Sequence, residues 1–119
     1  MSREELVKKV ISVLETIVDP EIGIDIYNLG MIYGIDVVGN KVKIKMTLTT
    51  PMCPLANVIP YMITEELKSK LGVEAEIELV YDPPWTPERM TEKGRRMFKE
   101  KYGYDVVEAY RSMYRGQEQ

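Results

Sequence analysis

The chain has 119 residues, of which 45% are hydrophobic and 29% are charged, and this balance is typical of one water-soluble globular domain. Its formal net charge is -3 and its basic residues are dispersed among acids, which argues against a nucleic-acid-binding surface. The sequence contains no histidine, so that serine–histidine and cysteine–histidine catalysis, histidine-ligated zinc and a histidine pH switch are all excluded.

A first helix is predicted over residues 3–18, where apolar residues recur at helical spacing. We expect Pro20 to end it, because the residue before a proline is pushed out of the helical region. The connection that follows, residues 22–30, is apolar and must pack against another part of the chain. This region carries three acids, Asp19, Glu21 and Asp25. They are either functional, as metal ligands or acid–base groups, or ordinary solvated side chains.

Two antiparallel strands are predicted next, over residues 31–38 and 41–48, joined by a tight turn at Gly39-Asn40. The second of them alternates strictly, so that one face of the sheet should pack on a core and the other should face water. The residues expected to face the core are Val42, Ile44, Met46 and Leu48. The residues expected to face water are Lys41, Lys43, Lys45 and Thr47.

A second helix is predicted up to Leu71, with Gly72 as its C-terminal cap. Its start is open, because Pro60 would lie inside a helix that begins at Pro54 and would remove a backbone hydrogen bond. In the alternative, Asn57 is the N-cap and Pro60 lies in the first turn, where proline is tolerated.

A third strand is predicted over residues 73–81, with glutamates on its outer face that complement the lysines of the preceding strand. The sequence leaves open whether this strand pairs with the first strand or with the second. The predicted fold class is α+β: a two-layer sandwich of order α-β-β-α-β, with a three-stranded mixed sheet and both helices on its apolar face.

Residues 86–119 are predicted to form a helical C-terminal extension of a single domain that spans residues 1–119. Its first helix should cover residues 91–102, with Thr91 as N-cap and Gly103 as its end. A second apolar stripe at residues 106–114 either packs on the domain or contacts a partner. Just before the extension, Trp85 follows two prolines and is either a core anchor or a lid.

Residues 49–54 read Thr-Thr-Pro-Met-Cys-Pro and contain the only cysteine. If Pro54 is the first helical residue, Cys53 becomes the N-cap, where free N–H groups and the helix dipole favour its thiolate form. A thiolate is both a nucleophile and a metal ligand, and the hydroxyls of Thr49 and Thr50 can donate to a sulfur or to a bound anion. In the alternative, Cys53 is a small buried apolar residue. Asn28 is similarly either a turn residue or a ligand contact.

Four motifs in this order resemble the small iron–sulfur assembly family once called domain of unknown function 59, which includes the SufT and PaaD-like proteins and the cytosolic iron–sulfur targeting component of eukaryotes. They are Asp19-Pro20-Glu21, Asn28-Leu29-Gly30, the stretch from Leu48 to Pro54, and Pro83-Pro84-Trp85. The resemblance covers residues 5 to about 98. It implies an α+β assembly-type fold and a role in maturing or delivering clusters. It also implies a set of functional residues, with Cys53 as the reactive or ligating one: Asp19, Glu21, Asn28, Thr49, Thr50, Cys53 and Trp85.

Ligand counting limits this implied role, because a typical cluster takes four thiolates and this chain offers one. We therefore expect no tightly bound cofactor, but transient carriage of iron or an iron–sulfur cluster to client apoproteins, with assembly scaffold proteins as further partners. A homodimer would supply two thiolates. The alternative is a metal-free adaptor that docks client or scaffold proteins. A thiol-dependent transferase is harder to support, since the sequence offers no histidine or second cysteine, and we expect no enzyme activity.

No apolar run approaches the roughly 20 residues that span a bilayer, and the first residues do not form a signal peptide. A single cysteine cannot form an internal disulfide, which agrees with a reducing compartment. The sequence therefore predicts a cytoplasmic protein with neither membrane nor nucleic acid among its partners.

Overall fold

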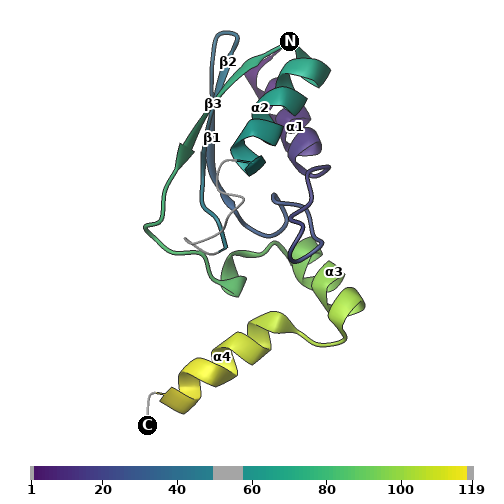
Figure 1. Cartoon of the computed structure of the whole chain (residues 1–119), viewed down its shortest axis with the longest axis vertical. Coiled ribbons are helices and arrows are strands. Elements are labelled where there is room, and N and C mark those ends of the chain that lie inside the picture. The colour runs from purple at the N-terminus through teal and green to yellow at the C-terminus, as the bar shows by residue number, and fades with distance from the viewer. Residues whose placement is uncertain (1, 50–57, 118–119) are drawn as a thin grey trace.

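The computed structural model describes residues 2–49 and 58–117. In Figure 1, α1 and α2 lie together on one face of the sheet, while α3 and α4 lead away from it toward the C-terminus. This arrangement confirms the predicted α+β class and the order of its elements. The elements are α1 (Arg3–Leu14), β1 (Ile32–Val38), β2 (Lys41–Met46), α2 (Val58–Leu71), β3 (Glu74–Leu79), the 3-10 helix η1 (Pro87–Arg89), α3 (Glu92–Tyr102) and α4 (Val106–Gln117).

The sheet has the order β1-β2-β3, with β1 antiparallel and β3 parallel to β2. The third strand therefore pairs with the second, which the sequence left open. The charges that were expected to complement each other do face each other across the β2–β3 pair, where Glu76 forms exposed ion pairs with Lys41 at 3.6 Å and Lys43 at 4.0 Å. Exposed pairs of this kind contribute at most about 1 kcal/mol. The register joins Lys41 with Glu74, Lys43 with Glu76, and Lys45 with Glu78.

The core lies between the sheet and the two helices that cover it. The apolar residues of β2 are at most 1% exposed, and they meet buried side chains from the inner faces of α1 and α2. Each large apolar side chain buried in this way stabilises the fold by roughly 1.5–3 kcal/mol. The central contributors are Val10, Leu14, Val42, Ile44, Met46, Ile59, Ile63 and Leu67.

The predicted end of the first helix is wrong, because α1 stops at Leu14 and not near Pro20. The backbone beyond it makes hydrogen bonds to a later segment instead of continuing the helix. The N–H of Ile26 donates to the carbonyl of Ile17 at 2.9 Å, and the N–H of Asp19 donates to the carbonyl of Ile24 at 3.0 Å. These bonds within residues 17–26 replace the last predicted turn of helix.

Thr47 was expected to face water, and this expectation is wrong. It is 1% exposed, and its hydroxyl oxygen has no hydrogen-bond partner among the residues that the structure describes. The reason is that β2 ends at Met46, after which the N–H of Thr47 donates to the carbonyl of Met31 at 2.8 Å. Beyond the end of a strand, alternation no longer determines which side chains face solvent.

Within the described residues α2 runs from Val58 to Leu71, so the choice between the two predicted starts lies outside the described residues. Both predicted N-caps, Cys53 and Asn57, lie outside the described residues. Gly72 ends α2 as predicted: its φ is +67°, and its N–H donates to the carbonyl of Lys68 at 3.0 Å.

The first helix of the C-terminal segment begins and ends as predicted. The Thr91 hydroxyl accepts the N–H of Gly94 at 3.0 Å, and Gly103 ends α3 with a φ of +84°. In α4, Val107 at the start is buried, whereas Met113 is 64% exposed. The apolar stripe of α4 therefore packs on the domain at its first turn, through its contact with η1.

Asp105 connects α3 to the start of α4. Its Oδ1 accepts the N–H groups of Val107 and Glu108, at 2.9 and 3.4 Å, and its Oδ2 accepts from Arg95 at 3.0 Å. Burial raises the pKa of Asp105, but the hydrogen bonds from Arg95, Glu108 and Val107 outweigh it, so this pKa lies below its ordinary value of 3.8.

A lowered pKa means that the Asp105 carboxylate stabilises the start of α4 above pH 3.8, and that this contribution is lost as pH falls through the folded-state pKa below that value. We expect the amides of Val107 and Glu108 to lose protection from hydrogen exchange in that acid range, as followed by NMR. Asp105→Asn keeps an oxygen that caps the helix but does not titrate, so the acid transition should disappear. Persistence of the transition in this variant would show that another group controls it.

Candidate functional site

Residues 18–25, called the acid loop below, form a closed loop between α1 and β1. An isolated antiparallel bridge joins its first and last residues. The N–H of Gly23 donates to the carbonyl of Asp19 at 2.7 Å, and Gly23 has a φ of +80°, which favours glycine at this turn. The loop is therefore a defined structure although it contains no helix or strand.

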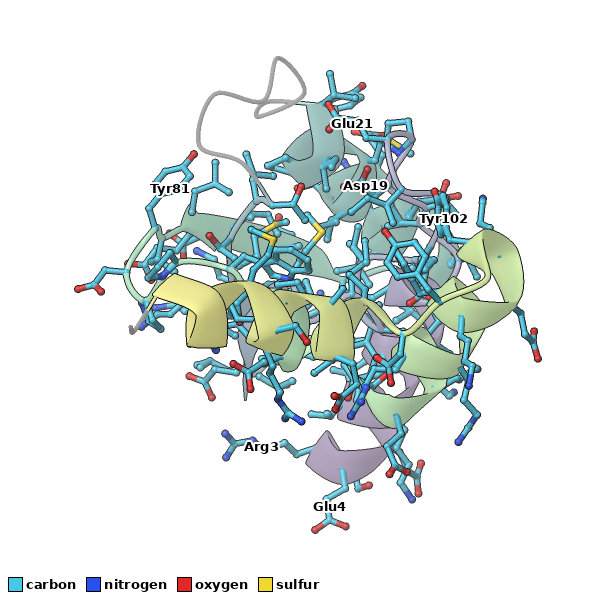
Figure 2. The ribbon with its side chains drawn as sticks, turned by 90° about the horizontal axis from the view of Figure 1, so that it is seen from below. Arg3, Glu4, Asp19, Glu21, Tyr81 and Tyr102 are labelled. Atoms are coloured by element: carbon cyan, nitrogen blue, oxygen red, sulfur yellow. The ribbon has the colours of Figure 1, made fainter. Side chains whose placement is uncertain are left out.

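The carboxylate of Asp19 organises the tip of the acid loop. Asp19 is 4% exposed, and its Oδ1 accepts the N–H groups of Glu21 at 2.8 Å and Ile22 at 3.2 Å. Glu21 itself is exposed. Figures 1 and 2 both show this loop close to the start of α2, with Asp19 and Glu21 labelled in Figure 2. The Asp19 carboxylate thus holds the shape of the loop tip, and Glu21 lies exposed on that tip.

Asn28 is almost fully buried, at 3% exposed, and bonds three elements together. Its Nδ2 donates to both carboxylate oxygens of Asp25 at 3.0 Å and to Glu15 Oε2 at 3.1 Å. Its Oδ1 accepts from the Thr91 hydroxyl at 2.6 Å. The amide is engaged on both its nitrogen and its oxygen, which favours the turn interpretation of Asn28 over a contact with a ligand.

Trp85 is a half-buried side chain packed against the core. Its Nε1 donates to the carbonyl of Leu29 at 2.7 Å. The guanidinium of Arg89 lies 4.4 Å above the ring of Tyr33, whose hydroxyl donates to the carbonyl of Pro83 at 2.8 Å. These contacts favour the interpretation of Trp85 as an anchor, with the chain around it bonded to the sheet.

The structure thus places Asp19 and Glu21 in the acid loop, with Asn28 bonded to Asp25 at the end of that loop and Trp85 bonded to Leu29 beyond it. Thr49 is half-buried just past the end of β2. The predictions for Thr50 and Cys53 lie outside the described residues. Across residues 2–49 and 58–117, no three Asp, Glu, Cys or His side chains gather closely enough to hold a metal ion.

Sequence reasoning missed three residues that bond to the loops between α1 and β1: Glu15, Thr91 as a partner of Asn28, and Tyr102. The Tyr102 hydroxyl donates to the carbonyl of Ile22, 80 positions away along the chain. Neither periodicity nor motif spacing carries a signal for contacts at such separations. In the part of the chain that the structure describes, every helix is too short or too polar to cross a lipid bilayer.

A two-layer α+β domain with this acid loop, and with a single cysteine in the stretch before α2, has the features of a small metal–sulfur assembly domain. Residues 8–79 match the family described as iron-sulfur cluster assembly protein, and the chain belongs to that family. This confirms the resemblance found in the sequence.

Three similar proteins illustrate the relationship. The Fe-S protein maturation auxiliary factor YitW of Bacillus subtilis is 39% identical over 90 residues, which cover 74% of this chain and 88% of that protein. An iron-sulfur cluster carrier protein of Deinococcus radiodurans is 38% identical over 60 residues, 50% of this chain but 17% of that protein. The crystal structure of a domain of unknown function 59 from Bacillus anthracis is 34% identical with a TM-score of 0.74, covering 79% of this chain and 92% of that one.

Proposed function

We propose that this protein is an iron–sulfur maturation factor that takes up iron or a cluster as transient cargo and passes it to client apoproteins. Family membership supports the general role, as do the names of the relatives, which are maturation and carrier factors. The observation that carries the proposal is the acid loop, where Asp19 shapes a turn that places Glu21 close to the start of α2. In the sequence, the only thiol lies just before that helix.

The side chains proposed as ligands suit iron that is bound only transiently. Thiolate sulfur favours iron–sulfur chemistry, and a carboxylate oxygen is an acceptable ligand for iron. One chain supplies the thiolate of Cys53 and the carboxylate of Glu21, fewer than the four ligands that a stable cluster takes. The remaining positions belong to the cysteines of a client, of a scaffold or of a second copy. A cluster coordinated in this incomplete way transfers readily.

In this proposal Cys53 bonds the cargo and Glu21 adds a carboxylate from the acid loop. The hydroxyls of Thr49 and Thr50 donate hydrogen bonds to sulfur. Asp19 shapes the loop, because its Oδ1 accepts two backbone N–H groups. Asn28 and Trp85 hold the surrounding backbone.

A second candidate is a metal-free adaptor that docks client or scaffold proteins. It is favoured by apolar side chains that are exposed at the start of α2, where Val58 is 45%, Tyr61 65% and Met62 39% exposed. Exposed apolar groups that gather on one helical turn suit a protein–protein contact. This candidate needs no chemistry from Cys53.

The deciding experiment is anaerobic reconstitution with iron and sulfide, followed by visible absorption and by transfer to an apo-ferredoxin. The wild type should show a charge-transfer band that decays on transfer, and Cys53→Ser should lack the band while its circular dichroism is unchanged. Glu21→Gln should retain a weaker band, and Glu74→Gln, an exposed acid on β3, is the matched control that should behave as wild type. An equal band in Cys53→Ser would contradict the proposal. Client binding that survives Cys53→Ser but is lost in Tyr61→Ser would support the adaptor.

A further inference from the structure

The C-terminal end of α3 is bonded to the acid loop. The hydroxyl of Tyr102 donates to the carbonyl of Ile22 at 2.5 Å, and Lys101 Nζ donates to the carbonyl of Gly23 at 3.4 Å. Figure 2 shows Tyr102 on the side of α3 that faces the acid loop. Both acceptors directly follow Glu21 in the chain, so these bonds act on the tip of the loop.

Both backbone polar groups of Ile22, its N–H and its carbonyl, make hydrogen bonds to side chains. Its N–H donates to Asp19 Oδ1 at 3.2 Å, and its carbonyl accepts from Tyr102. The first bond comes from within the loop and the second from α3. Together they determine the orientation of the peptide groups on both sides of Ile22, and therefore the direction in which the neighbouring Glu21 leaves the backbone.

The helix that carries Tyr102 is itself firmly placed. At its start, the N–H of Thr91 donates to the carbonyl of Asn28 at 3.0 Å, and Lys93 pairs with Glu15 at 3.3 Å. An ideal Cβ on Gly94 would lie 2.1 Å from the Asn28 carbonyl oxygen, so the helix lies directly against that backbone. These contacts leave α3 little freedom to move away from the loop.

The ring of Tyr102 is also held in place by its neighbours. Its centroid lies 4.4 Å from that of Phe98, which in turn meets Tyr104 edge-on at 5.5 Å. Aromatic packing of this kind limits the rotamers of Tyr102. The hydroxyl is therefore positioned toward Ile22 before any cargo arrives.

We infer that Tyr102 is a positioning residue for cargo binding: its hydroxyl holds the acid loop in the shape that presents Glu21. The inference rests on the proposed function and adds to it a role for the C-terminal segment. The family match ends at residue 79, so Tyr102, the residue that positions the acid loop, lies outside the matched region. A site held by such supporting contacts binds without first ordering its own backbone, which strengthens binding.

The test uses the full chain and two variants that differ only in which hydroxyl they lose. Tyr102→Phe removes the donor to Ile22 and keeps the ring that packs on Phe98. Tyr104→Phe is the matched control, because it removes from the same aromatic cluster a hydroxyl that makes no hydrogen bond among the described residues. The first measurement is amide hydrogen exchange at Glu21 and Ile22, and the second is the rate at which iron(II) passes from the loaded protein to a chelator.

In Tyr102→Phe, both the exchange at Glu21 and Ile22 and the release of iron should become about fivefold faster, the change that loss of one hydrogen bond of typical net strength produces. Exchange at the β2 amides should not change, and Tyr104→Phe should match the wild type in both measurements. Unchanged exchange at the loop, or equally faster exchange throughout the core, would overturn the inference.

Faster loop exchange without faster release of iron would show that the loop is held by Tyr102 but that this has no role in cargo binding, and would also overturn the inference. If the wild type takes up no iron, the proposed function fails, and with it the role in cargo binding. The exchange measurement would still decide whether the Tyr102 hydroxyl orders the acid loop, so the two failures are distinguishable.

Discussion

Replacing Gly94 with alanine should lower the free energy of unfolding by about 3 kcal/mol, at the upper end of what overpacking usually costs. The new Cβ would lie 2.1 Å from the carbonyl oxygen of Asn28 and 2.9 Å from its carbonyl carbon. Both are backbone atoms, so no side-chain rotation can relieve the contact, and α3 has to move away from Asn28. This loss exceeds the roughly 1 kcal/mol that alanine gains over glycine inside a helix.

Urea unfolding followed by circular dichroism measures this effect. Gly34→Ala is the matched control, because a Cβ there meets only the Cβ of Lys45 at 3.9 Å, an ordinary contact. We expect the control to change stability by less than about 0.5 kcal/mol. Equal stabilities for the two variants would mean that α3 does not lie against Asn28 as closely as the structure has it.

Asn28→Ala should also lower the free energy of unfolding by about 3 kcal/mol, because it leaves buried polar groups without their partners. The carboxylate of Asp25, itself 4% exposed, loses the side-chain donor that bonds both of its oxygens. The Thr91 hydroxyl loses its acceptor at 2.6 Å, and Glu15 loses a donor at 3.1 Å.

Chemical denaturation again provides the measurement, with Asn40→Ala in the exposed β1–β2 turn as the matched control. The control should change stability by less than about 0.5 kcal/mol. In combination with Thr91→Val, the effect of Asn28→Ala should be less than additive, with an interaction energy of roughly 0.5–3 kcal/mol. Strict additivity would show that the bond between these two side chains contributes nothing to stability.

Both variants also bear on the acid loop, because they disturb the contact between α3 and the backbone around Asn28. If Tyr102 positions the loop from the far end of α3, Gly94→Ala should speed amide exchange at Ile22 as well. This connects the stability of the C-terminal segment to the proposed handling of cargo, although no residue of α3 belongs to the matched family region.

Sequence patterns predicted strands and helix ends correctly where interactions between residues close together in the chain determine the structure. The alternation of β2 placed Val42, Ile44 and Met46 in the core, because neighbouring side chains of a strand must point to opposite faces. Thr91 and Gly103 marked the ends of α3, because a capping hydroxyl and a left-handed glycine satisfy the free backbone groups there. The same reasoning failed for the end of α1, where the backbone bonds to the loop that follows it, and for Thr47, whose N–H bonds to Met31 on an earlier segment.

The candidate site divides in the same way. The motif around Asp19 and Glu21 could be found from the sequence, and in the structure the Asp19 carboxylate accepts the backbone N–H of Glu21. The sequence did not show that Asn28 connects α1, the acid loop and α3. This role depends on hydrogen bonds to Glu15 and Thr91, which lie far apart in the chain. A motif identifies the residue but does not show which of its atoms are already engaged.

By itself, the sequence determined the α+β class, the family and the single thiol available for chemistry, because periodicity, motif order and composition are local or countable properties. Only the tertiary structure decided that β3 pairs with β2, that α1 stops early, and that Tyr102 reaches the acid loop. The physical reason is that such contacts join residues far apart in the chain, and their energies depend on packing and burial that exist only once the whole domain has folded.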